Sequence, residues 1–179
     1  MTLYETIRLN LKFALKNKDN KVVSVLRLSL AAVKNKELEK RHRFSKTPLF
    51  STKERDKIEK PEKLNELSRL NDNEVLEVLM REAKKRKESI GIFNSGGRHD
   101  LELKEREELD ILEKYLPKQL SELEMNIEID KILLKIDLEK TRDFGTIMGL
   151  VMAQLKGRVD GKLVGDFLKK KLVFLQNIS

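Results

Sequence analysis

The sequence contains no cysteine and no tryptophan, and only 3 prolines among its 179 residues. The lack of cysteine excludes a disulfide scaffold, a thiolate nucleophile and any Cys-ligated zinc or iron–sulfur site. No apolar run approaches the roughly 18 residues that a membrane span requires. The first residues lack the basic-then-apolar order of a secretory signal, so we expect no membrane association and a cytoplasmic location.

Charge, in contrast, is abundant and unevenly distributed. Charged residues make up 38% of the chain, against roughly 25% in an average globular domain. The formal net charge is +8. Residues 1–60 hold 16 Lys and Arg against 7 Asp and Glu, and the remainder is nearly neutral. A chain this polar buries only a modest core, which argues against large enzyme barrels and sandwiches, and its basic excess forms a local patch.

Apolar residues recur three or four positions apart along most of the chain, the spacing of one buried helix face. Residues suited to capping the expected helices stand in front of them: Asp19, Asn71 with Glu74, Asp100, Ser121 with Glu124, Asp143 and Asp160. No alternating strand pattern is present. The sequence therefore predicts an all-α protein.

A boundary near Pro117 to Ser121 divides the chain into two predicted helical parts. The N-terminal multi-helix domain covers 1–119 and the C-terminal three-helix domain covers 120–179. The helices of the second are expected over about 121–136, 143–156 and 160–175.

One stretch of the first domain breaks the helical pattern. Residues 43–70 are polar and lysine-rich, and Pro48 and Pro61 punctuate them. This composition predicts a mobile loop that contains one short helix.

Five of the eight glycines lie between residues 145 and 165. Gly145 and Gly149 are four apart, as are Gly161 and Gly165, so each pair can share a helix face. A glycine inside a helix costs about 1 kcal/mol relative to alanine, so this placement needs a reason. Close packing of two helix backbones is favoured over a smooth surface for a sugar-phosphate backbone. Met148 and Met152 are expected to fill the core.

The segment from Gly157 to Lys162 is typical of an anion site at a helix N-terminus, because Arg158 and Lys162 flank it. It is not a P-loop, which needs four residues between its glycines and Ser or Thr after the lysine. The Asp160 carboxylate can also cap the N–H groups that an anion would use. On this motif alone, a capped turn between two helices is favoured.

Two rows of cations lie in the first third, each along one helix face: Arg8, Lys12 and Lys16, then Arg27, Lys34 and Arg41. Binding to a phosphate backbone requires such rows, although a solvated helix face has the same pattern. Because few aromatic residues are available for stacking, a structured or double-stranded nucleic acid is favoured over single strands. A further basic run over 81–87 wraps around its helix and is predicted to face solvent.

Catalytic groups are scarce. His42 and His99 are the only histidines, too few for a histidine-based metal site, and we expect no catalytic residues, metal or cofactor. Ser95, His99 and Asp100 include the residue types of a catalytic triad, but triads are built from distant segments and not from one loop.

Three ordered blocks resemble the GatB/YqeY family, and specifically its YqeY-like proteins. The first runs from Leu26 to Glu37 and includes Arg27 and Lys34. The second runs from Val78 through Arg81–Ser89, Gly97-Arg98 and Asp100-Leu101 to Tyr115-Leu-Pro-Lys-Gln-Leu120. The third comprises Gly145-Thr-Ile-Met-Gly149 and Gly157-Arg-Val-Asp-Gly-Lys-Leu-Val164. The chain departs from this pattern over 43–70, which is longer than usual for the family.

The resemblance implies two all-helical parts, of which the second is similar to the tail of the B subunit of tRNA-dependent amidotransferases. That tail engages tRNA. The resemblance makes Gly157, Arg158, Asp160, Gly161 and Lys162 candidates for a tRNA-facing turn. With the basic rows on the first third, this favours a tRNA-binding helical module that acts beside an amidotransferase or an aminoacyl-tRNA synthetase.

Two alternatives belong to other classes. Family membership also implies carbon–nitrogen ligase activity with glutamine as amido donor, which would yield Gln-tRNA(Gln) from Glu-tRNA(Gln), ATP and glutamine. The chain shows no glutaminase nucleophile and no phosphate-activating loop for this reaction. A protein–protein adaptor is the second alternative, and it would capture a partner without RNA.

Overall fold

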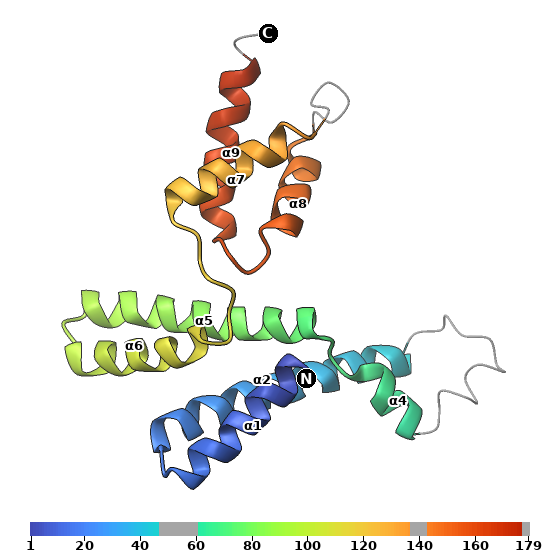
Figure 1. Cartoon of the computed structure of the whole chain (residues 1–179), viewed down its shortest axis with the longest axis vertical. Helices are drawn as coiled ribbons and strands as arrows, with labels where there is room; N and C mark the ends of the chain where they lie inside the picture. The colour runs from blue at the N-terminus through green and yellow to red at the C-terminus, as the bar shows by residue number, and fades with distance from the viewer. Residues whose placement is uncertain (47–60, 137–142, 177–179) are drawn as a thin grey trace, which may run out of the picture. The chain divides into compact units, whose positions relative to one another are not determined.

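A computed structural model describes residues 1–46, 61–136 and 143–176 (Figure 1). These described residues form eight α-helices and no strand, which confirms the all-α prediction. Internal contacts group the chain into two compact units, Met1–Leu116 and Pro117–Ser179. The domains expected at 1–119 and 120–179 stay a prediction, because compactness does not show that either part folds alone.

The first unit holds five of these helices: α1 (Leu3–Lys16), α2 (Asn20–Lys46), α4 (Pro61–Ser68), α5 (Asp72–Ser95) and α6 (His99–Glu113). Helices α1 and α2 lie side by side, as do α5 and α6 (Figure 1). Helix α2 also contacts α4, α5 and α6, so it connects the two helix pairs. Gly97, with φ of +68°, forms part of the tight turn between α5 and α6.

Local capping explains where these helices begin. The Asn71 side chain accepts from the Glu74 N–H, and the Glu74 carboxylate accepts from the Asn71 N–H, which confirms the predicted capping box. Asp19 caps α2 as expected, through the Val22 N–H at 3.1 Å. The predicted cap at Asp100 is wrong. Helix α6 begins at His99, before Asp100. The Asp100 carboxylate therefore lies in the first turn of the helix, where it accepts from the Arg98 side chain.

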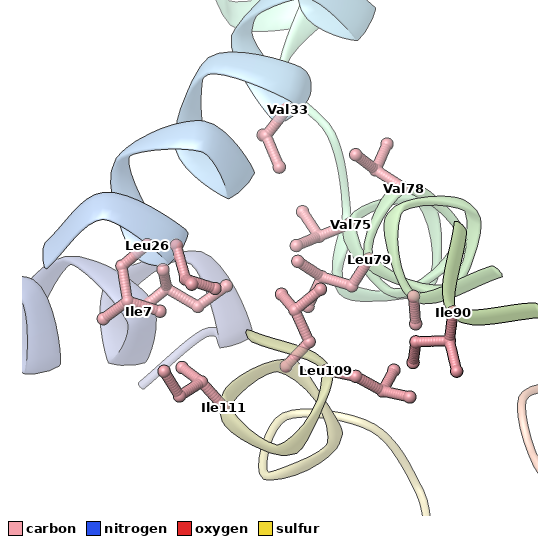
Figure 2. Packing of buried hydrophobic residues seen from close by; sticks show 12 residues of the cluster. Ile7, Leu26, Val33, Val75, Val78, Leu79, Ile90, Leu109 and Ile111 are labelled. Carbon is pink, nitrogen blue, oxygen red and sulfur yellow. The ribbon is translucent and has the colours of Figure 1, made fainter. Parts of the chain in front are cut away.

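The core of the first unit forms where the apolar faces of α1, α2, α5 and α6 meet (Figure 2). Its fully buried side chains are Ile7, Val25, Leu26, Val33, Val75, Leu79 and Leu112. Polar contacts at its edge tie α1 to the rest of the unit. The Leu3 N–H donates to Asp72 at 3.0 Å and the Asn10 amide donates to the Tyr115 hydroxyl at 2.9 Å.

The loop expected over 43–70 is only partly found. Helix α2 continues through Arg43 to Lys46, so the helical pattern extends further than its weakening apolar periodicity predicted. The one short helix expected in this stretch is α4. Residues 47–60, which include Pro48, lie outside the described residues. Lys40 of α2 donates to both carboxylate oxygens of Glu74 and to the Arg69 carbonyl.

The second unit contains α7 (Glu122–Leu133), α8 (Phe144–Gln154) and α9 (Gly161–Gln176), close to the three helices expected there. The predicted box of Ser121 and Glu124 caps α7, and Asp143 caps α8. One face of each helix contributes to a separate core, formed by Met125, Ile129, Ile132, Leu133, Ile147, Val151, Leu155, Val159, Val164 and Leu168. In the part of the chain that the structure describes, no helix is long and apolar enough to cross a membrane.

Candidate nucleic-acid interface

The turn between α8 and α9 is held by a segment almost forty positions earlier in the sequence. Gly157 is buried and has φ of +80°. Its carbonyl accepts from the Gln119 side-chain amide at 2.6 Å, and the next carbonyl, that of Arg158, accepts from the Leu120 N–H at 2.8 Å. The structure thus brings together Gln119 and Leu120 of the second resembling block with Gly157 and Arg158 of the third.

This turn requires glycine at position 157. An L-residue in the left-handed region costs roughly 1–2 kcal/mol, so Gly157→Ala should lower the free energy of unfolding by about that amount. Gly149→Ala is the matched control, because Gly149 is exposed within α8 and a Cβ there would meet nothing within 4 Å. Alanine favours a helix over glycine by about 1 kcal/mol, so the control should stabilise. Urea unfolding followed by circular dichroism measures both, and equal effects would contradict the assignment.

Asp160 occupies the N-terminus of α9. Its carboxylate Oδ1 accepts from the Lys162 N–H at 2.7 Å and lies 3.4 Å from the Leu163 nitrogen. These are the N–H groups that a bound phosphate would otherwise use. The expected capped turn is therefore present, and an anion near it depends on the neighbouring side chains and not on the helix N-terminus.

The two cations of the turn have different surroundings. Arg158 is half-buried and faces the acidic side of α7, where its charge helps to lower two carboxyl pKa values. The pKa of Glu124 is lowered mainly by its hydrogen bond from the Ser121 N–H, and that of Glu128 by its hydrogen bond from Lys131. Lys162 is exposed, with no carboxylate in ion-pair distance among the described residues. Lys162 is therefore the more available phosphate ligand.

The glycine pairs differ from each other. A Cβ on Gly161 would lie 3.5 Å from the Met152 methyl, and one on Gly165 would lie 3.9 Å from that of Met148. Both are ordinary contacts with flexible side chains, so the expected close approach of two helix backbones is not found at the α9 pair, although both methionines pack against the core as expected. It is not found at the α8 pair either, since Gly145 and Gly149 are exposed.

Arg27 and Lys34, the two site residues predicted in the first unit, are both exposed on α2. Lys34 makes an ion pair at 3.1 Å with Glu37, the last residue of the same resembling block. Arg27 has no carboxylate partner among the described residues. The same holds for the predicted row on α1, whose Arg8, Lys12 and Lys16 are all exposed. Arg8 instead lies over the Tyr4 ring, 5.8 Å from its centroid.

The basic run over 81–87 is not entirely solvent-facing, contrary to expectation. Arg86 is only 8% exposed and lies between α5 and α6, where it contacts Glu108 at 2.9 Å and Glu82 at 3.9 Å. A signal for this burial was present in the sequence, since residue 86 continues the buried stripe of Val75, Leu79, Ala83 and Ile90 at spacings of three and four. Glu102 and Arg106 of α6, four positions apart, form an ion pair at 2.7 Å.

Comparison with known proteins adds one match. The family model described as Yqey-like protein matches residues 55–172, more than half of the chain. This range includes α4 to α8 and most of α9, whereas α1, α2 and the first resembling block precede it. No curated protein shows significant similarity to the chain. Within the described ranges, no three His, Asp or Glu side chains are grouped as a metal site would require.

Proposed function

The chain belongs to the YqeY-like protein family, and from this we propose that it is a tRNA-binding helical module. It would act beside a tRNA-dependent amidotransferase or an aminoacyl-tRNA synthetase, in transamidation or aminoacyl-tRNA metabolism. The family resemblance supplies the class of partner. The charge distribution of the first unit supplies the physical reason for binding an anion.

The observation that carries the proposal is a set of unpaired cations on α1 and α2, which we call the hairpin cations: Arg8, Lys12, Lys16 and Arg27. All four side chains are exposed, and none has a carboxylate partner among the described residues. A cation already paired with a carboxylate gains little from a phosphate, because it must first give up its partner. An unpaired cation releases a counterion from the nucleic acid at no such cost.

The other basic residues of this unit are mostly satisfied within the protein. Lys85 pairs with Glu82 at 2.7 Å, Lys87 with Glu113 at 2.9 Å, and Arg106 with Glu102. Helices α5 and α6 hold seven Lys and Arg residues, and four of them form ion pairs with glutamates of these two helices. The hairpin cations are therefore the favoured phosphate ligands of this unit.

Filter binding of the full chain to tRNA over a salt series tests the proposal. If several phosphates are neutralised, the logarithm of the binding constant should fall linearly with the logarithm of the salt concentration, with a slope near −0.9 per phosphate contact on a duplex. A slope between about −3 and −5 is expected from the hairpin cations and Lys162 together. Absent binding, or binding that does not change with salt, would overturn the proposal.

The turn of the second unit should contribute a smaller share. Replacing Arg158 and Lys162 together by alanine is expected to weaken tRNA binding by about 3- to 10-fold and to reduce the salt slope by about 1 to 2. The effect is limited because Arg158 faces Glu124 and Glu128, and because Asp160 already caps the helix.

The matched control for this pair is Lys169→Ala with Lys170→Ala, which removes the same charge from exposed positions further along α9. It should change affinity by less than about 2-fold. If both pairs weaken binding equally, the turn has no special role and only the net charge of the unit matters.

A further inference from the structure

One exposed aromatic side chain lies within the row of unpaired cations on α1. Phe13 is 52% exposed, and it is the only exposed one of the aromatic side chains that the structure describes. Tyr4, the other aromatic residue of α1, is half-buried, and Arg8 lies over its ring. In the described ranges, no cation lies over the Phe13 ring. The ring of Phe13 is therefore available to a ligand.

Helix geometry places this ring beside two of the hairpin cations. On the side of α1 that faces away from its buried residues, four exposed side chains fall within about 100° of arc: Leu9, Lys12, Phe13 and Lys16. Residues three or four positions apart on a helix are neighbours, with Cβ atoms about 5–6 Å apart. Leu9 and Lys16 thus both adjoin Phe13. We call these four residues the α1 patch, which combines a small apolar surface with two unpaired positive charges.

Building on the proposed function, we propose that the α1 patch binds an unpaired nucleotide of the RNA. The base stacks on Phe13, and the phosphates beside it contact Lys12 and Lys16. Stacking on an aromatic ring tolerates any sequence, because every base has a π-face. Folded RNA presents such bases in its loops, bulges and ends. The partner is then a structured RNA with a single-stranded segment next to a duplex, and not a plain duplex.

The charges beside the ring carry this argument, because a single exposed apolar side chain is common on protein surfaces. Ile92 of α5 shows the contrast. It is 70% exposed, more than Phe13. The positions three and four residues away from it hold no cation: Glu88, Ser89, Ser95 and Gly96. Phe13 differs from such a residue because unpaired lysines and an uncovered aromatic ring occur together, as phosphate and base binding require.

An anionic lipid surface would also attract apolar and basic side chains, but α1 is poorly suited to it. An interfacial helix inserts its whole apolar face into the membrane. The apolar face of α1, with Ile7 and Ala14, is buried in the first unit. Only Leu9 and Phe13 of the α1 patch would be left to insert. RNA is therefore the favoured occupant.

Filter binding of the full chain to two hairpin RNAs of equal length tests the inference. One hairpin is blunt, and the other has a short single-stranded 3′ end. The wild type should bind the second about 5- to 20-fold more tightly, because it gains a stacked base. Phe13→Leu keeps an apolar, helix-forming residue and removes the π-face. This variant should lower the preference to less than about 2-fold, while its affinity for the blunt hairpin and its salt slope stay those of the wild type.

Two further variants serve as controls. Phe13→Trp restores an aromatic ring and should keep the preference for the single-stranded end. Ile92→Ala removes an exposed apolar side chain that no cation adjoins, and it should also keep the preference.

The outcomes separate this inference from the proposed function. A wild type without the preference, or a Phe13→Leu variant that keeps it, would overturn the inference, while tRNA binding with the expected salt slope would still support the proposed function. If no RNA binds in a salt-dependent way, both are wrong. Binding to phosphatidylserine vesicles that is lost in Phe13→Leu, without a preference between the hairpins, would assign the α1 patch to lipid and reject the RNA base.

Discussion

A variant with Arg8, Lys12, Lys16 and Arg27 all replaced by glutamine is expected to bind tRNA at least about 100-fold more weakly than the wild type at 0.1 M salt. Each phosphate contact contributes close to one unit to the slope of log affinity against log salt. Loss of four contacts should therefore flatten the slope by roughly 3 to 4. Filter binding at several salt concentrations measures both quantities.

The chain offers a control with the same change in charge. Lys63, Lys85, Lys87 and Lys131 are also exposed, but each pairs with a glutamate within 3.0 Å. Replacing these four by glutamine lowers the net charge as much as the first variant does. Because their charges are already balanced, tRNA affinity should fall by less than about 10-fold.

Comparison of the two variants separates a specific surface from a general charge effect. Equal losses would show that tRNA responds to net charge alone and would remove the hairpin cations as the binding surface. The surface substitutions should leave the far-ultraviolet circular dichroism and the unfolding midpoint nearly unchanged, because none of the eight side chains is buried.

The second large effect concerns the buried arginine between α5 and α6. Arg86→Ala is expected to lower the free energy of unfolding by about 3 kcal/mol, because it leaves the carboxylates of Glu108 and Glu82 without their shared cation. Both glutamate side chains are only 18% exposed, so water replaces the lost partner poorly. Urea unfolding followed at 222 nm measures the loss.

A double replacement gives the contrasting result. Arg86→Met with Glu108→Leu removes both charges and fills the space with apolar groups, so its stability should lie within about 1 kcal/mol of the wild type. Glu82 retains Lys85 at 2.7 Å in this variant. Lys85→Ala, which breaks that exposed pair alone, should cost less than about 0.5 kcal/mol.

These variants also bear on how α5 and α6 hold together. If the double variant is as unstable as Arg86→Ala, the loss comes from packing and not from an unpaired charge. If Arg86→Ala lowers the free energy of unfolding by less than about 1 kcal/mol, water reaches the glutamates in the variant. The ion pair is then not the main interaction that stabilises the packing of α5 against α6.

Helix boundaries were largely predictable because they depend on nearby residues. The boxes at Asn71 and Ser121 and the caps at Asp19, Asp143 and Asp160 need only side chains within three positions of the helix start. The Asp100 prediction was wrong for a related reason. Arg98 competes for that carboxylate, and the helix begins before it.

The burial and ion pairing of the charged residues were not predictable in the same way. In sequence, Lys34, Arg27 and Arg86 are all cations on helices. In the structure the first is paired, the second is exposed and unpaired, and the third is buried. The Arg86 partner, Glu108, is supplied by a different helix. Periodicity indicates that position 86 faces inward, but it does not say which carboxylate will meet it.

The all-α class, most helix boundaries, the family resemblance and the capped turn between the last two helices could be predicted from the sequence, because each depends on local geometry or on an ordered motif. The folded structure was needed to show which cations remain unpaired, how Gln119 and Leu120 hold the turn at Gly157, and which side of α7 packs into the core. Those outcomes depend on contacts between segments tens of residues apart, and these contacts form only when the chain folds.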